Sequence, residues 1–257
     1  MTGLKTILDT LEPAPDGWRG TIPETWLQGR TCYGGLSAAL ALHAAQASDV
    51  DLPPLRSALV AFVGPLSGTV VVRATRLRRG RNAAFVQADV EGEAGLGLRA
   101  TFVFMAPVPS RVDHRVEAPL PFAVPEPGAP TQNGHPAVRF SQNFDMVDDV
   151  AGTGPAEWRR WVRLRDRDGL DPAVELIAVA DCLPPAALKL IGGPAPVSSM
   201  TWQLNLLDTP TLPRDGWWLL ESATDHARAG TSSQRMAIWS PDGGRIAEQM
   251  QSVALFG

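Results

Sequence analysis

The stretch that decides the fold is RTCYGGLSAALALHAAQA, Arg30–Ala47, an Ala-rich segment that opens on a pair of glycines. Gly34 and Gly35 predict a loop that feeds a helix from about Leu36 to Ala47. Small apolar residues occupy every face of this helix, so we expect it to be covered on several sides. No charge interrupts residues 31–48, but their polar side chains oppose transfer into a bilayer. The segment therefore predicts a helix buried in a protein core.

Four strand-like segments follow this helix, and glycine-rich turns separate them. They are rich in Val, Ala, Thr and Phe, which favour strands. The four segments are Leu55–Val63, Thr69–Arg79, Asn82–Glu91 and Gly97–Met105. One buried helix followed by consecutive strands predicts a long antiparallel sheet that curls around a central helix.

The second half of the chain repeats this order. Residues Leu170–Leu188 predict another helix, with Asp171 as its N-cap and Pro172 at its first position. Pro184 and Pro185 are expected to close it. Four strand-like segments come next: Val197–Leu206, Trp217–His226, Ser232–Trp239 and Arg245–Phe256. The repeated order indicates an internal duplication, although the two halves share little sequence identity.

A proline-rich stretch separates the halves. Eight of the 23 prolines fall between Ala106 and Pro136, a density that suits neither a helix nor a central strand. We therefore predict two domains, residues 1–110 and 135–257, joined by a connection over residues 111–134. The length of 257 residues is compatible with one large domain or with two small ones.

Composition excludes several classes of function. The net charge of −4 gives no basic field for nucleic acid. Two cysteines are too few for a disulfide scaffold, and the first residues do not form a secretory signal, so a cytoplasmic protein without a membrane span is expected. The four histidines lack the spacing of metal ligands, and the glycine-rich motifs for dinucleotides or triphosphates are absent. We therefore expect neither a metal nor a cofactor.

Several short motifs, in a fixed order across both halves, resemble the acyl-CoA thioesterases with a double hotdog fold, the bacterial type II thioesterase group. The resemblance covers nearly the whole chain except the proline-rich connection. The motifs are Arg30-Thr31-Cys32-Tyr33-Gly34-Gly35, Leu55-Arg56-Ser57, Phe62-Val63-Gly64-Pro65, Leu77-Arg78-Arg79-Gly80-Arg81, Trp161-Val162-Arg163, Ala180-Asp181-Cys182-Leu183-Pro184, Pro196-Val197-Ser198-Ser199 and the strand Ala247–Phe256.

The resemblance implies an α+β fold of two fused hotdog domains, each a curled antiparallel sheet around a central helix. It also implies hydrolysis of an acyl-CoA substrate. In this family an aspartate of the second helix, a hydroxyl on the next strand and a glutamine on the last strand form the catalytic set. By motif, these are Asp181, Ser199 and Gln251. Further association into a homo-oligomer is compatible with the fold.

Thioester hydrolysis needs an activated water and donors for a developing oxyanion, and these residue types can supply both. Asp181 lies near the C-terminal end of its predicted helix, where the helix dipole disfavours an anion, so we expect its pKa to be raised towards that of a useful base. The alternative is that Asp181 only caps the turn before Pro184. Backbone N–H groups at Gly34 and Gly35 are expected to bind the substrate oxygen, unless these glycines only form a turn.

The hydroxyl and the carboxamide each have a neighbour of the same type. Ser199 and Thr201 are two residues apart on one strand, so either hydroxyl could face the site. Gln249 and Gln251 alternate in the same way on the last strand. The motif favours Ser199 and Gln251.

Other constellations give weaker hypotheses. A nucleophilic cysteine, Cys32 or Cys182 with His43, is an alternative to water attack, although a buried free thiol is the commoner explanation. Two arginine clusters, which are usually solvated, are candidates to meet the phosphates of coenzyme A. They are Arg76, Arg78, Arg79 and Arg81, and Arg159, Arg160, Arg163, Arg165 and Arg167.

Three rival functions remain open on the sequence alone. The first is a non-catalytic protein of the same fold that binds acyl-CoA or an acyl carrier. The second is a hotdog dehydratase or hydratase, which would need a histidine beside its aspartate. The third is an interaction module with a degenerate site.

Overall fold

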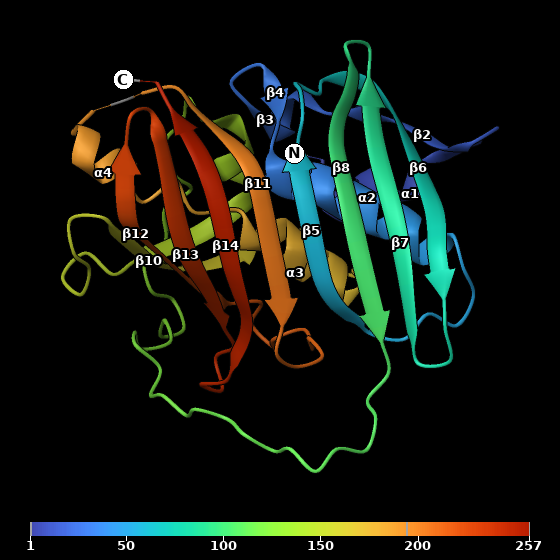
Figure 1. Ribbon diagram of the computed structural model, residues 1–257. Coiled ribbons are helices and arrows are strands. Elements are labelled where there is room, and N and C mark those ends of the chain that lie inside the picture. Colours follow the sequence, from blue (N-terminus) through green and yellow to red (C-terminus); the bar gives the residue numbers. More distant parts are fainter. Residues whose placement is uncertain (1, 194, 257) are drawn as a thin grey trace.

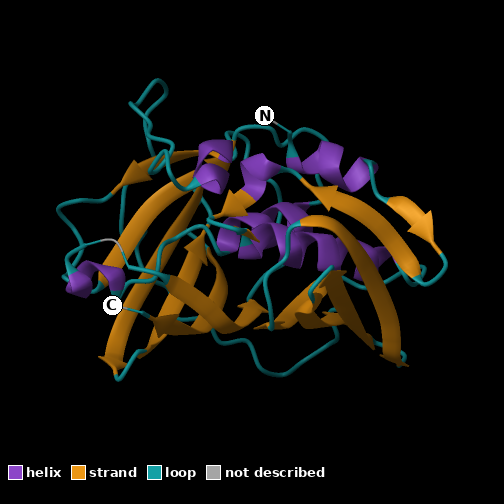
Figure 2. Ribbon diagram, turned by 90° about the horizontal axis from the view of Figure 1, so that it is seen from above, coloured by secondary structure: helices purple, strands orange, loops and turns teal. Residues whose placement is uncertain are grey.

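An antiparallel sheet of 12 strands bends around the long helices in the computed structural model, which describes residues 2–193 and 195–256. Figure 1 shows the strands side by side in front of the helices, and Figure 2 shows the sheet curving around them. From edge to edge the strand order is β1-β2-β6-β7-β8-β5-β11-β14-β13-β12-β10-β9. The strands of the two halves of the chain therefore occupy the two halves of one sheet.

The first half of the chain supplies two helices and eight strands. The helices are α1 (Leu4–Asp9) and α2 (Gly34–Ala47). The strands are β1 (Glu12–Ala14), β2 (Gly17–Ile22), β3 (Leu27–Gln28), β4 (Thr31–Cys32), β5 (Leu55–Phe62), β6 (Gly68–Arg79), β7 (Ala83–Gly92) and β8 (Gly95–Met105). Strands β3 and β4 pair only with each other, and a 3-10 turn at Glu24–Trp26 precedes them.

The second half supplies two more helices and six strands. A 3-10 turn at Arg139–Asn143 comes first, and the helices are α3 (Pro172–Ala180) and α4 (Leu188–Ile191). The strands are β9 (Phe144–Asp148), β10 (Glu157–Leu164), β11 (Val197–Leu206), β12 (Trp218–Arg228), β13 (Thr231–Trp239) and β14 (Arg245–Leu255). No described helix is long and apolar enough to cross a membrane.

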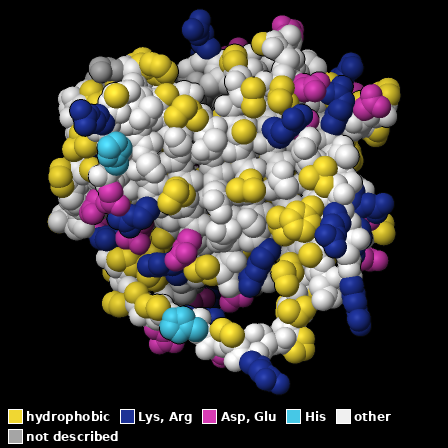
Figure 3. Space-filling view, viewed as in Figure 1, with side chains coloured by type: hydrophobic (Ala, Val, Ile, Leu, Met, Phe, Trp, Pro, Cys, Tyr) yellow, Lys and Arg dark blue, Asp and Glu magenta, His cyan; other side chains and the backbone are white. Residues whose placement is uncertain are grey.

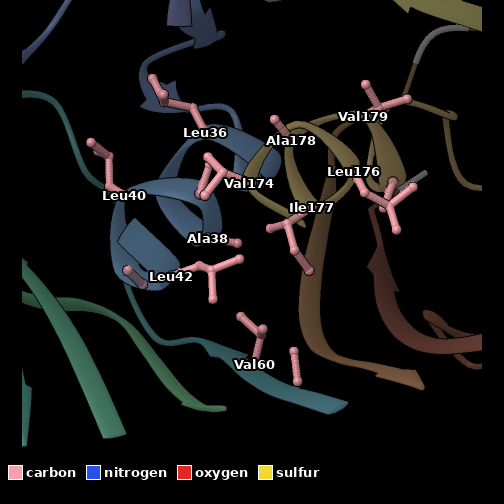
Figure 4. Close-up of a cluster of buried hydrophobic side chains, with 14 of the residues drawn as sticks. Leu36, Ala38, Leu40, Leu42, Val60, Val174, Leu176, Ile177, Ala178 and Val179 are labelled. Carbon is pink, nitrogen blue, oxygen red and sulfur yellow. The ribbon is translucent and has the colours of Figure 1, made fainter. Parts of the chain in front are cut away.

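The helix predicted from about Leu36 to Ala47 is present, and it begins two residues earlier than expected, at Gly34. Alanines and leucines on all its faces are buried because it packs both on the sheet and on α3. In Figure 4, Leu36 and Ala38 of α2 lie near Val174 and Ala178 of α3. This all-round burial explains why the helix has no polar face.

Tyr33, the residue before α2, connects the start of α2 to the end of α3. Its hydroxyl donates a 2.8 Å hydrogen bond to the carbonyl oxygen of Ala178. Its ring stacks on Phe140 with 4.1 Å between ring centroids and an interplanar angle of 4°. A buried hydrogen bond therefore holds the start of α2 against the end of α3, and an aromatic contact holds it against the Arg139–Asn143 turn.

The two halves of the sheet join through β5 and β11, which pair antiparallel. Leu59 lies opposite Gln203, and the Ser57 hydroxyl donates to Asn205 Oδ1 at 2.9 Å. Buried residues alternate with exposed ones along β11 from Trp202 onward, so one face of the sheet covers the helices. The other face is mostly neutral over its middle, and charged side chains gather towards its edges (Figure 3).

The proline-rich stretch contains no helix or strand between the end of β8 and residue 131. It runs below the sheet in Figure 1 and reaches the second half. Leu120 and Phe122 pack there against a cluster that includes Trp161 and Trp217, and the Trp161 indole donates to the Ala123 carbonyl at 2.8 Å. The connection is thus anchored along part of its course.

The structure differs from the sequence expectations at several elements. Strands β2 and β10 lengthen the sheet on both sides, and neither was expected as a strand. The second helix stops at Ala180, before the two prolines, and Asp181 is its C-cap. Three residues outside the helix, 181–183, therefore separate it from Pro184. The predicted N-cap is confirmed, because the Asp171 carboxylate accepts from the N–H groups of Ala173 and Val174.

Replacing Gly35 by alanine should destabilise the protein. A Cβ at this position would lie 2.5 Å from the Ala178 carbonyl oxygen and 2.6 Å from the Tyr33 ring. Helix propensity alone would favour alanine by about 1 kcal/mol. Overpacking should outweigh this gain and lower the free energy of unfolding by about 1–3 kcal/mol, measured by urea titration. Gly193→Ala is the control, since a Cβ there meets open space; equal stability of both variants would contradict this account of α2–α3 packing.

Candidate functional site

A cavity of about 940 Å³ opens where the start of α2, the end of α3 and the paired strands β11 and β14 come together. Both halves of the chain contribute to its wall. The predicted residues Asp181, Ser199, Gln251 and Gly34 all line it, together with apolar side chains such as Phe62 and Leu66. Residues far apart along the chain are therefore gathered around one cavity.

The Asp181 carboxylate lines this cavity from the end of α3 and is partly buried. Gln251 Nε2 donates to Asp181 Oδ1 at 2.8 Å, and the backbone N–H of Gly35 donates to the same carboxylate. A Cβ on Gly34 would overlap Asp181 Oδ2, so glycine is required for the close approach of the carboxylate to the start of α2. Donors from both halves of the chain thus hold this one side chain.

Burial raises the pKa of Asp181 to about 7, and the hydrogen bonds from Gln251 and Gly35 oppose that rise. The expected rise in the pKa of Asp181 is confirmed, but its main cause is desolvation rather than the helix dipole. Asp181 is the C-cap residue of α3, where the helix dipole disfavours an anion, and its carboxylate also contacts the N-terminal end of α2, where the dipole favours one. The two helix ends therefore act in opposite directions on the pKa of Asp181.

The two glutamines of β14 share the inner face of the sheet, as their spacing predicts. Gln251 is 2% exposed and Gln249 is 7% exposed. They differ in their partners, because Gln249 Oε1 accepts a 2.8 Å hydrogen bond from the Trp202 indole. Gln251 is thus the glutamine that contacts Asp181, and Gln249 belongs to the packing around Trp202.

A β-bulge separates the two candidate hydroxyls of β11. Ser199 pairs with Val253 and Thr201 pairs with Ser252, so two steps along β11 match one step along β14. The bulge at Met200 breaks the alternation of faces. Ser199 lines the cavity, while Thr201 lies on the exposed side. The expectation that both hydroxyls point the same way is therefore wrong.

Both cysteines line the cavity as buried free thiols. Burial raises the pKa of Cys32 far above its ordinary value and raises that of Cys182 to about 12. A thiol needs to ionise to act as a nucleophile, so neither cysteine is activated here. Within the described chain, no group of three or more His, Cys, Asp or Glu side chains is arranged to hold a metal ion.

The second arginine cluster is ion-paired within the protein. Arg159 bonds Asp149 and Glu221, and Arg163 bonds Asp145. Of this cluster, the cavity wall includes Arg160, which is buried and paired with Asp148. These pairs neutralise charges that the sequence alone presents as a basic run.

One polar residue behind this cavity was not expected from the sequence. Gln234 of β13 is 1% exposed and donates to Gln251 Oε1 at 2.6 Å. A signal for it exists in the sequence, because Gln234 occupies an inward position of an alternating strand, in phase with Met236 and Ile238. A polar residue at an inward position usually has a specific partner.

Family models match both parts of the chain. Residues 22–105 match the model of the acyl-CoA thioesterase N-terminal domain, and residues 104–255 match that of the acyl-CoA thioesterase C-terminal domain. A comparison with curated proteins gave no match.

Solved structures share the fold along nearly the whole chain. A hotdog-fold protein of unknown function from Alicyclobacillus acidocaldarius has a TM-score of 0.85 at 21% identity, covering 100% of this chain and 99% of its own. A putative thioesterase II from Thermobifida fusca has a TM-score of 0.82 at 20% identity, covering 100% and 98%. An acyl-CoA thioesterase II from Mycobacterium marinum has a TM-score of 0.77 at 18% identity, covering 99% of each chain. The chain therefore has a hotdog fold with a large antiparallel sheet.

The variant Asp181→Asn should be more stable than the wild type above neutral pH. The folded protein holds a proton on Asp181 up to a pH of about 7, whereas the unfolded chain releases it near the ordinary aspartate pKa of 3.8. The wild type should therefore lose stability as pH rises between these values, and the variant should not. We expect a stability difference that is small at pH 4 and exceeds about 1 kcal/mol at pH 8, measured by urea unfolding. A difference that does not vary with pH would contradict a raised pKa at this carboxylate.

Proposed function

The chain belongs to the acyl-CoA thioesterase family, and on that premise we propose that it hydrolyses acyl-CoA thioesters to a free acid and coenzyme A. The observation that carries the proposal is the buried Asp181 carboxylate, with a pKa raised to about 7, hydrogen-bonded to Gln251 on a cavity wall. A general base works best when its pKa lies near the working pH. A purely structural cap at the end of α3 would need neither the cavity nor the buried donor.

We assign the attacking water to a position between Asp181, Ser199 and Gln251. Gln251 Nε2 carries two hydrogens, and one is used by Asp181, so the second is available to the water or the substrate. The Ser199 hydroxyl can orient the same water without adding a charge. Asp181 takes a proton from the water while the water oxygen forms a bond to the thioester carbon. That proton then passes to the sulfur as the carbon–sulfur bond breaks.

The oxyanion that develops on the thioester carbonyl oxygen needs a hydrogen-bond donor on the side away from the attacking water. The Gly35 N–H bonds Asp181 and therefore acts on the base rather than on the substrate. Gly34 lines the cavity in the first turn of α2, where backbone N–H groups have no partner within the helix. We assign the oxyanion to the Gly34 N–H, at the positive end of the α2 dipole.

Direct attack by water fits this site better than a covalent intermediate on sulfur. The pKa values of Cys32 and Cys182 are raised by burial, so both thiols stay protonated at neutral pH. The other titratable side chain that faces Asp181 is Tyr33, whose pKa is also raised by burial. Among Asp181, Tyr33 and the two cysteines, Asp181 is therefore the side chain that changes its charge near neutral pH.

We assign the two halves to two hotdog units, residues 1–110 and 135–257, with residues 111–134 as the connection. Each half has one long helix and a run of antiparallel strands, and α2 packs on β6, β7 and β8 while α3 packs on β10. In this assignment the base, the hydroxyl and the carboxamide come from the second unit. The first unit contributes the glycines at the start of α2.

Substitution of the three polar residues should abolish most of the activity. The test measures release of free coenzyme A thiol from a panel of acyl-CoA chain lengths with a thiol-reactive dye. Loss of a general base should lower kcat of Asp181→Asn by about 10²–10⁴-fold. Ser199→Ala and Gln251→Met should lower kcat by about 10-fold or more, because each removes a donor to the water.

Thr201→Ala is the matched control, since this hydroxyl is two residues from Ser199 and lies on the exposed side of the sheet. It should retain the wild-type rate. Turnover by Asp181→Asn at the wild-type rate would overturn the assignment of the base. Tight binding of acyl-CoA by calorimetry without turnover on any chain length would replace the enzyme by a binding protein of the same fold.

A further inference from the structure

Gln234 lies directly behind the proposed site and takes no part in its wall. It is on the inner face of β13, next to β14, where it pairs in register with Gln251. Its side chain is 1% exposed, and all its hydrogen-bonding groups have partners within the protein. A buried amide with this many partners has one orientation.

The backbone N–H of Ala186 fixes that orientation. Ala186 N donates to Gln234 Oε1 at 3.0 Å, and a backbone N–H can only donate. The nitrogen of Gln234 must therefore face the other way, where it donates to Gln251 Oε1 at 2.6 Å and contacts Met236 Sδ at 3.5 Å. The nitrogen of Gln251 must then face Asp181, to which it donates at 2.8 Å.

The sequence around Ala186 fixes the direction of its backbone N–H. Pro184 and Pro185 precede it and have no N–H groups of their own, and Ala186 is fully buried. The Leu188 N–H donates to the Pro185 carbonyl at 3.0 Å, which closes a turn with Ala186 at its second position. The prolines that follow the second helix thus anchor a chain of hydrogen bonds that ends on the carboxylate.

We propose that Gln234 is a positioning residue that locks the Gln251 amide with its nitrogen towards Asp181. This inference rests on the proposed function for its effect on catalysis, but the lock itself is a property of the protein alone. In the locked state Gln251 can donate to an ionised Asp181 and cannot accept from a protonated one. Gln234 therefore favours the ionised form of the Asp181 carboxylate over the protonated form.

Of the two hydrogen-bond partners of Asp181, Gln251 is the one that can change from donor to acceptor, because its amide can rotate. The Gly35 N–H can only donate. The titratable groups beside the carboxylate are Tyr33 and Cys182, and Cys32 lies in the same cavity wall; burial raises the pKa values of all three. Arg160 on β10 lines the same cavity and is paired with Asp148. His135 also lines the cavity, from the loop before the Arg139–Asn143 turn.

The test removes the lock and measures the titration of Asp181 itself. In Gln234→Met the Gln251 amide is free to turn, so its oxygen can accept from protonated Asp181, and the pKa of Asp181 should rise by about 0.5–1 unit. The carboxyl carbon of Asp181 is followed by NMR after ¹³C labelling of aspartate, with Asp181→Asn used for assignment. The acidic limb of the pH profile of kcat/KM should move by the same amount. At pH 7, kcat should fall several-fold, with KM changed by less than about threefold.

Two further variants make the result decisive. Ala186→Pro removes the orienting N–H without touching a buried glutamine, at a turn position that favours proline, and it should shift the pKa of Asp181 in the same direction. Gln249→Met is the matched control, because it also removes a buried glutamine but loses a bond to Trp202 instead. It should leave the titration of Asp181 unchanged.

The outcomes separate this inference from the proposed function. A raised pKa of Asp181 in Gln234→Met or Ala186→Pro, with no change in Gln249→Met, supports the lock even if the wild type hydrolyses no acyl-CoA. An unchanged pKa of Asp181 in the folded Gln234→Met and Ala186→Pro variants overturns it, even if the wild type is an active thioesterase. A shift of equal size in Gln249→Met also overturns it, because the effect would then be a general loss of packing.

Discussion

The contact between the start of α2 and the end of α3 is the constraint on which the rest of the structure depends. The Tyr33–Ala178 hydrogen bond and the glycines at residues 34 and 35 let the two helices meet closely enough for Gly35 to reach the Asp181 carboxylate. A larger residue at either glycine would separate them. The buried carboxylate, the cavity and the contribution of both halves of the chain all follow from this approach.

The chemistry of Asp181 comes from a balance between burial and a small set of donors. Desolvation alone would keep the carboxyl protonated, and two hydrogen bonds bring its pKa back to about 7. The donor on one side is a backbone group and cannot reorient. The donor on the other side is a side-chain amide, which depends on Gln234 and on the turn at Ala186 for its direction. The reactivity proposed for this site is therefore determined by residues that do not touch the substrate.

Local sequence patterns predicted the central helices and the strands that follow each of them, because burial dictates their periodicity and propensity. The same reasoning missed β2 and β10, which lie towards the edges of the sheet and carry charged side chains such as Arg19, Arg159 and Arg160. It placed the end of α3 at the prolines, whereas the helix ends at Ala180, and its C-cap Asp181 lies at the cavity beside the Gly35 donor. The bulge at Met200 depends on pairing between β11 and β14, which one strand alone does not reveal. Motif resemblance proposed Asp181, Ser199 and Gln251 together, whereas the contact of Gln234 with Gln251 depends on the pairing of β13 with β14.

The continuous pairing of β5 with β11 has a consequence for how this site comes to exist. If the halves were separate chains, the Gly35 donor and the Asp181 carboxylate would meet only after a bimolecular encounter, at a rate limited by dilution. The covalent connection replaces that encounter by a high effective concentration, on the order of millimolar for flexible tethers. It also frees each half to diverge, because a self-complementary interface is no longer required. One half can then carry the Asp181 carboxylate and the other the helix start that receives it.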